Sequence, residues 1–173
     1  AVVEAWLDRN MLLALPAAAF RGATALQRLY LAHNPLADVH GDAFVGLPAL
    51  QVLDVSHAAL VTLPPQLLAP LPALTSLQLN NNGLSALPAG LFAPTPALQS
   101  LQLQWNPLQA LPPGAFSALA ALSSLSLYGT RLWHGADIDG SQLNATLYGT
   151  GAAAVHHDCI VSFVPVCSNA CSS

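Results

Sequence analysis

The stretch LTSLQLNNNGLSALP, residues 74–88, carries the pattern that decides the fold of this chain. An apolar Leu-Gln-Leu segment is followed by three asparagines and a glycine, residue types that usually mark turns. The same pattern recurs at a constant interval along the chain, and the earliest of six copies begins at Val2. Each copy is apolar at positions 1, 4, 6 and 11, and most have Asn at position 9. The leucines that open the later copies are Leu26, Leu50, Leu74, Leu98 and Leu122.

Positions 4 and 6 of each copy lie two apart, so both side chains point to the same face of one strand. A single copy cannot bury that apolar face, whereas stacked copies bury it continuously. A second motif, LPxxxF, follows as LPAAAF, LPPQLL, LPAGLF and LPPGAF, with VHGDAF as a weaker version. Its apolar residues are predicted to complete the core, and its prolines favour extended or turn backbone.

The repeated sequence resembles the leucine-rich repeat family, in its 24-residue extracellular type, from residue 2 to about residue 134. The resemblance implies an α/β-type solenoid, or horseshoe, of about six to seven coils with a parallel β-sheet on the concave face. The convex side is expected to be mostly irregular or short 3-10 helix. We predict a repeat domain over 1–134 and a C-terminal capping region over 135–173. Strands are expected near 4–8, 28–32, 52–56, 76–80, 100–104 and 124–128.

Position 9 is predicted to hold a structural ladder of asparagines. After each strand the chain bends and leaves interior backbone N–H and C=O groups that need partners. An inward Asn amide offers donors and an acceptor to such groups, so copies in successive coils are expected to act together. Asn80 and Asn81, at positions 7 and 8, are instead expected to face outward on the concave side. The ladder residues are Asn10, Asn34, Asn82 and Asn106, with Ala58 and Thr130 as interruptions.

Both ends of the repeat domain are expected to need covering, because open sheet edges invite pairing. The first copy begins at Val2 with no cap sequence before it, which favours a fragment whose open end is covered by further sequence or by a partner. At the other end, the LYGT of residues 127–130 recurs at 147–150. This recurrence suggests a degraded seventh coil near 143–150.

The C-terminal region contains all the cysteines of the chain, which are Cys159, Cys167 and Cys171. Cysteines gathered at one terminus favour a disulfide-stapled cap in an oxidising compartment, although the pairing stays open and one of the three is left over. The resemblance implies a cap with four cysteines, but the positions behind Trp133 do not match it. The sequon at Asn144 is a candidate glycosylation site. We therefore expect an extracellular, cell-surface or secretory-lumen protein; the alternative is an intracellular protein with reduced thiols.

Charge is scarce in this chain, with 4 basic and 8 acidic residues and a formal net charge of −4. The lack of a basic footprint argues against nucleic-acid binding, and no apolar run approaches the roughly 18 residues of a membrane-spanning helix. The HHDC segment at 156–159 fits no common zinc spacing, so no metal or other cofactor is expected. Asp54, Ser56 and His57 have the residue types of a catalytic triad, but two of them lie side by side on one strand. No enzymatic activity is predicted.

The outward positions 3, 5, 7 and 8 remain as the candidate binding surface. The first copies carry charged and aromatic residues there, whereas later copies carry amides and hydroxyls with two aromatic residues at one side. Exposed aromatics beside amides suit recognition, because they combine apolar area with directional hydrogen bonds. The candidate contact residues are Trp6, Tyr30, His33, Asp54, His57, Asn80, Asn81, Gln102, Trp105 and Tyr128.

Two functions from different classes follow. The first is a non-catalytic recognition module that binds a protein, peptide or glycan on the concave face, as the resemblance implies. The second is a structural subunit of a larger extracellular or cell-surface assembly. The charge-free interval from 55 to 130 favours the second, because free domains usually keep well-mixed charges for solubility.

Overall fold

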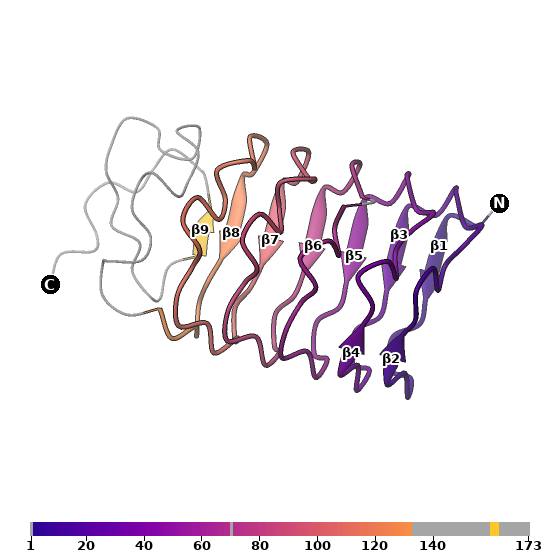
Figure 1. Ribbon diagram of the computed structural model, residues 1–173, viewed down its shortest axis with the longest axis horizontal. Coiled ribbons are helices and arrows are strands. Elements are labelled where there is room, and N and C mark those ends of the chain that lie inside the picture. Colours follow the sequence, from indigo (N-terminus) through magenta and orange to yellow (C-terminus); the bar gives the residue numbers. More distant parts are fainter. Residues whose placement is uncertain (1, 70, 133–159, 163–173) are drawn as a thin grey trace, which may run out of the picture.

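The computed structural model describes residues 2–69, 71–132 and the backbone of residues 160–162. Six short parallel strands lie side by side on the concave face, each in register with the strand of the next repeat, as Leu53 is with Leu77. Five complete turns of a β-solenoid therefore connect them, in a single row (Figure 1). The strands are β1 (Glu4–Trp6), β3 (Arg28–Tyr30), β5 (Val52–Asp54), β6 (Ser76–Gln78), β7 (Ser100–Gln102) and β8 (Ser124–Ser126).

These strands start where the sequence predicts but end two positions earlier. The chain turns at position 8, which adopts a left-handed conformation in every coil, with φ between 51° and 66°. Backbone in that region cannot continue a strand, and it is reached most readily by Gly and, among other residues, by Asn and His. Three of the six coils have His or Asn at this position and one has Gly. The residues are Arg9, His33, His57, Asn81, Trp105 and Gly129.

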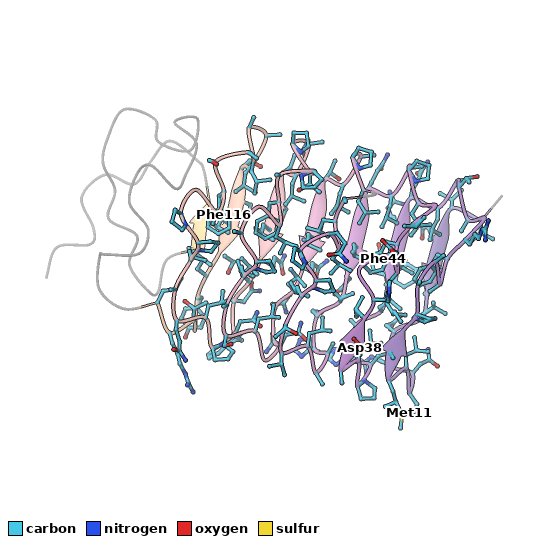
Figure 2. The ribbon with its side chains drawn as sticks, viewed as in Figure 1. Met11, Asp38, Phe44 and Phe116 are labelled. Carbon is cyan, nitrogen blue, oxygen red and sulfur yellow. The ribbon has the colours of Figure 1, made fainter. Side chains whose placement is uncertain are left out.

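The core runs along the inside of the solenoid. Leu29, Leu53, Leu77, Leu101 and Leu125 occupy position 4 and are at most 1% exposed. The LPxxxF motif adds a second row, in which the rings of Phe92 and Phe116 pack with centroids 5.8 Å apart. Phe44 and Phe116, which are labelled in Figure 2, are at most 1% exposed. Each coil thus buries its apolar residues against its neighbours, as a stacked repeat must.

The convex side is built from turns and one small sheet. β2 (Ala14–Leu15) pairs in parallel with β4 (Asp38–Val39). Elsewhere isolated turns follow the prolines, as where the Leu67 N–H donates to the Pro64 carbonyl at 3.1 Å. In the described ranges the convex side has no helix, so single turns stand where short 3-10 helices were expected. A helix long and apolar enough to cross a membrane is likewise not found in those ranges.

The C-terminal edge of the sheet has a strand of opposite direction. The strand next to β8 is β9 (Ile160–Ser162), which runs antiparallel, with Leu125 opposite Val161. The chain therefore reaches this edge from the opposite direction to a repeat. Residues 143–150, the capping region around Trp133, Asn144 and the three cysteines lie outside the described residues.

Candidate functional site: the concave face

The asparagine side chains at position 9 lie behind the concave face and connect neighbouring coils by hydrogen bonds. The Asn82 side-chain Nδ2 donates to the carbonyls of Leu79 and Val55, both at 3.0 Å. Its Oδ1 accepts the backbone N–H of Leu60 at 3.2 Å. One amide thus joins its own coil to the preceding coil through two different backbone groups. Because Asn82 is only 8% exposed, water does not readily replace these bonds.

Asn34 and Asn106 make the same three contacts in their coils. Asn106 Nδ2 donates to the Leu103 and Leu79 carbonyls at 2.9 Å, and its Oδ1 accepts the Leu84 N–H at 3.1 Å. Asn34 repeats the pattern toward the first coil. Asn10 is exposed and bonds only to carbonyls of its own coil. Ala58 has no amide, so the N–H of Leu36 has no asparagine acceptor.

Two pairs of stacked rings lie on the concave face of the first three coils. Trp6 and Tyr30, both at position 5, have centroids 4.1 Å apart and planes inclined by 19°. His33 and His57, both at position 8, have centroids 4.3 Å apart and planes inclined by 15°. Equal positions in neighbouring coils repeat at the strand spacing of about 4.8 Å, which brings flat side chains into stacking contact. The two pairs flank the side chains of position 7.

A hollow of about 400 Å³ lies between these ring pairs. At position 7 the second and third coils carry the small residues Ala32 and Ser56, which are 8% and 4% exposed and form its floor. Small side chains between two rows of rings leave space above them, and this is the physical origin of the hollow. The lining residues are Trp6, Asp8, Arg9, Tyr30, Ala32, His33, Asp54, Ser56, His57, Gln78 and Asn80.

The hollow carries more negative than positive charge. Asp8 and Asp54 line it against a single guanidinium, that of Arg9. Asp54 Oδ1 accepts the backbone N–H of Ser56 at 2.9 Å, which fixes the orientation of the carboxylate. Beside the hollow, Arg28 forms an ion pair with Glu4. Asp54 has no ion-pair partner within the described part of the chain.

The fourth and fifth coils fill position 7 with amides in place of small side chains. Asn80 lines the hollow on the concave side, but it is only 8% exposed, and its Nδ2 donates to Asn81 Oδ1 at 2.9 Å. Gln104 Nε2 donates to Gln102 Oε1 at 3.3 Å, so these two amide side chains are hydrogen-bonded to each other. The buried oxygens Asn80 Oδ1 and Gln104 Oε1 have no hydrogen-bond partner in the described residues.

The last two coils form a separate aromatic corner. The rings of Trp105 and Tyr128 meet edge to face, with centroids 4.9 Å apart. A Cβ atom on Gly129 would lie 2.6 Å from Cε3 of Trp105, so only glycine leaves room for the indole ring. Trp105 is 51% exposed and Tyr128 38% exposed, so this corner presents aromatic area to solvent.

The structure thus brings together six of the predicted contact residues in one hollow and leaves the other four outside it. Those that line the hollow are Trp6, Tyr30, His33, Asp54, His57 and Asn80. Asn81, Gln102, Trp105 and Tyr128 lie on the later coils. Sequence reasoning missed the contribution of Ala32 and Ser56. The signal was present as two small residues in succession at position 7, but small residues were not counted as site residues.

The arrangement does not assemble the chemistry of a triad. Asp54 bonds to the backbone of Ser56, and the Ser56 side chain lies in the buried floor. In the part of the chain with described side chains, no group of three or more His, Cys, Asp or Glu residues is placed to hold a metal ion. What the hollow offers is aromatic surface, carboxylates and fixed backbone, which are the elements of a binding site.

Comparison with known proteins agrees with this architecture. The family model described as leucine rich repeat matches residues 6–60, 24–84 and 72–132. Among solved structures, the "Crystal structure of TLR13-ssRNA13 complex" matches with a TM-score of 0.68 and 35% sequence identity. The match covers 71% of this chain and only 18% of that chain, while no curated protein matches significantly. Because the family model covers most of the chain and the coils have the expected register, the chain belongs to the leucine-rich repeat family.

Proposed function

We propose that the concave face of this chain recognises a protein partner, with the hollow of the first coils at the centre of the contact. Leucine-rich repeats and the solenoid fold make the chain a protein-interaction module in general terms. The finer proposal rests on Trp6, which is 64% exposed beside a hollow of about 400 Å³. A large apolar ring therefore stands next to space that a side chain can fill. Aromatic residues around such a pocket dominate the energy of many interfaces.

A protein or peptide suits the hollow better than a nucleic acid. The similar solved structure is a complex with ssRNA, so a nucleic acid is one ligand class to compare with a protein. In this chain, however, two carboxylates face the hollow against one guanidinium, and the whole sequence has a net charge of −4. Binding of a polyanion depends on cations that neutralise phosphates. A glycan is the remaining alternative, since it also stacks on aromatic rings.

The later coils are proposed to extend the same interface. The Trp105–Tyr128 corner adds exposed apolar area, and Asn81 and Gln102 add amides between the corner and the hollow. A partner that spans all six strands would contact aromatic residues at both ends and polar residues between them. That distribution matches an interface with two apolar anchors and a polar middle.

The test is capture of binding partners on the immobilised full chain, followed by an affinity measurement with the partner identified. Trp6→Ala and Tyr30→Ala are expected to weaken binding about tenfold each, because both truncate the ring stack. Met11→Ala is the matched control, since Met11 is 82% exposed and lies away from the concave strands (Figure 2). Equal losses for all three variants, or none, contradict the proposal.

The compartment is part of the proposal. We infer an extracellular or secretory-lumen location, with a glycan on Asn144 and disulfide bonding among Cys159, Cys167 and Cys171. The support is the sequon and the concentration of cysteines at one terminus. Intact-mass measurement of the protein from a secreting host, before and after glycosidase and reductant, checks both modifications. An unmodified mass with three free thiols contradicts them.

A second function, as a subunit of a larger assembly, has one observation in its favour. Val2 and Leu13 are 65% and 66% exposed, so the first coil presents an apolar surface. The equivalent of Val2 in the second coil is covered, as Leu26 at 1% exposure shows. Size-exclusion chromatography with light scattering tests this function. A concentration-dependent increase in mass supports assembly through this surface, and a monomer at all concentrations excludes self-assembly.

A further inference from the structure

The ring stack at position 5 ends at the second coil, because the third coil has a shorter side chain at this position. The rings of Trp6 and Tyr30 are nearly parallel at 4.1 Å, so their planes face along the solenoid axis. Trp6 covers one face of Tyr30, and the other face is directed toward the third coil. There the register partner of Tyr30 is Asp54, whose side chain is much shorter than a phenol ring. A flat aromatic face therefore stands beside a carboxylate, inside the hollow.

The carboxylate of Asp54 is held in one orientation, but its charge is not neutralised. Asp54 Oδ1 is held by the Ser56 N–H at 2.9 Å, which leaves Oδ2 without a role in the local fold. Arg28 is engaged by Glu4, and Arg9 lines the same hollow from the first coil. Neither forms an ion pair with Asp54. A half-buried carboxylate in such a place attracts a cation from outside the chain.

An aromatic face next to a carboxylate binds cations by two additive effects, the cation–π attraction and the ion pair. The guanidinium of arginine matches both best, because it is planar, stacks on rings and aims N–H groups at carboxylate oxygens. Resting on the proposed function and deepening it, we propose that the hollow takes an arginine side chain of the partner protein. The guanidinium stacks on the free face of Tyr30 and pairs with Asp54, and its aliphatic stem lies over Ala32 and Ser56.

The volume and charge of the hollow agree with this occupant. A volume of about 400 Å³ is at the lower end of the range for ligand pockets, enough for one long side chain rather than a whole oligosaccharide. Asp8 and Asp54 against Arg9 leave a net negative lining, which a cation neutralises. An acidic side chain in the same place would face repulsion and lose hydration without a partner.

The experiment titrates N-acetyl-arginine-N-methylamide into the full ¹⁵N-labelled chain and follows the amide and indole N–H resonances by NMR. The neutral isostere N-acetyl-citrulline-N-methylamide is the matched probe, since it keeps the shape and loses the charge. Saturable shifts are expected at Ser56, His57 and the Trp6 indole, with citrulline binding weaker by about five-fold or more. Shifts of the Trp105 indole are expected to be small.

Variants then separate the two effects. Asp54→Asn is expected to weaken arginine binding about five-fold, whereas Asp38→Asn, an exposed carboxylate on β4, leaves it unchanged. Tyr30→Phe is expected to retain binding because it keeps the ring face, and Tyr30→Leu to lose most of it. Each variant is first shown to keep the wild-type amide spectrum outside the hollow, and the two sites give independent tests should one variant be misfolded.

Several results overturn the assignment. These are equal binding of arginine and citrulline, no saturable shift with either, or insensitivity to Asp54→Asn. A neutral disaccharide or a short single-stranded RNA that binds with dependence on Trp6 but not on Asp54 assigns the hollow to another ligand class. If capture of the partner requires Trp6 and Tyr30 but not Asp54, the proposed function stands and the arginine assignment fails.

Discussion

The first three coils and the last three coils share one backbone but present different surfaces. In both halves the strands are in register, position 8 has a left-handed backbone conformation, and leucines fill the core. In the first half Ala32 and Ser56 leave position 7 nearly empty, and ring pairs stand on either side. In the second half Asn80 and Gln104 fill that position. Side-chain volume at one position of the repeat therefore decides whether the concave face is hollow or filled.

The charges are divided in the same way. Among the described residues, every formal charge on the concave strands belongs to the first three coils, and the sequence has none from 55 to 130. The hollow and the charged side chains lie in the same half, so the first half offers both a shaped site and electrostatic attraction to a ligand. The second half offers paired amides and one exposed aromatic corner. A repeat protein can thus keep its scaffold constant while each coil is specialised independently through its outward residues.

The largest expected effect comes from breaking the frame that both halves share. Asn82→Ala removes the hydrogen bonds that a buried side chain makes to its own coil and to the preceding coil, and is expected to lower the free energy of unfolding by about 3 kcal/mol. Asn10→Ala is the control, because Asn10 is exposed and bonds only within its own coil, and it is expected to lose less than about 1 kcal/mol. Urea denaturation measures both. Equal losses would show that the contacts between coils contribute nothing.

A smaller effect is expected at the aromatic corner of the second half. Gly129→Ala combines a left-handed φ of 66° with a Cβ atom 2.6 Å from the Trp105 ring. We expect it to lower the free energy of unfolding by about 2 kcal/mol. Gly90→Ala has a similar φ of 71° and open space around the new atom, so it isolates the backbone contribution of about 1 kcal/mol. Thermal or urea denaturation gives the difference. If the two variants are equal, the packing of Trp105 is not constrained by Gly129.

The contrast between the halves is tested by exchanging position 7 between them. Ser56→Gln places the residue type of the fifth coil into the floor of the hollow, and is expected to reduce partner affinity about tenfold by filling the space. Gln104→Ser makes the opposite change and is expected to leave affinity within about two-fold. Binding by calorimetry, with circular dichroism to check folding, gives the answer. Unchanged affinity for Ser56→Gln would separate the hollow from recognition.

The smallest effect is expected from completing the asparagine ladder in the third coil. Ala58→Asn would place an amide where its Oδ1 accepts the Leu36 N–H and its Nδ2 donates to the Val55 and Leu31 carbonyls. A gain of about 1 kcal/mol in unfolding free energy is expected from these bonds. Ala59→Asn, at the next position and exposed, is the control and is expected to be neutral. A destabilised Ala58→Asn variant would show that this coil has no room for the amide.

The sequence predicted the scaffold because the scaffold depends on periodic residue types. The constant repeat spacing places the core leucines and identifies position 9, and the structure places Asn34, Asn82 and Asn106 in equivalent hydrogen bonds between coils. The early ends of the strands were not predicted. The left-handed turn at position 8 does have a sequence signal, since His, Asn and Gly are residue types that tolerate left-handed backbone.

The candidate site was predicted only in part. Aromatic and charged residues at outward positions were identified from the sequence. The hollow, however, depends on small side chains at position 7 rather than on chemically reactive ones. Asn80 was expected to face outward as a contact residue; it lines the hollow, but it is only 8% exposed. The antiparallel β9 next to β8 was also missed, because it lies beyond the last full repeat and does not carry the repeat pattern.

By itself, the sequence determined the coil, its register and the inward residues, because each of these is a local pattern repeated at constant spacing. Only the tertiary structure decided which outward side chains meet. Trp6 with Tyr30, His33 with His57 and Trp105 with Gly129 are each one repeat apart, and their contact depends on the distance and tilt between stacked coils. The hollow arises in the same way, from the volumes of side chains that are neighbours in space and distant in sequence.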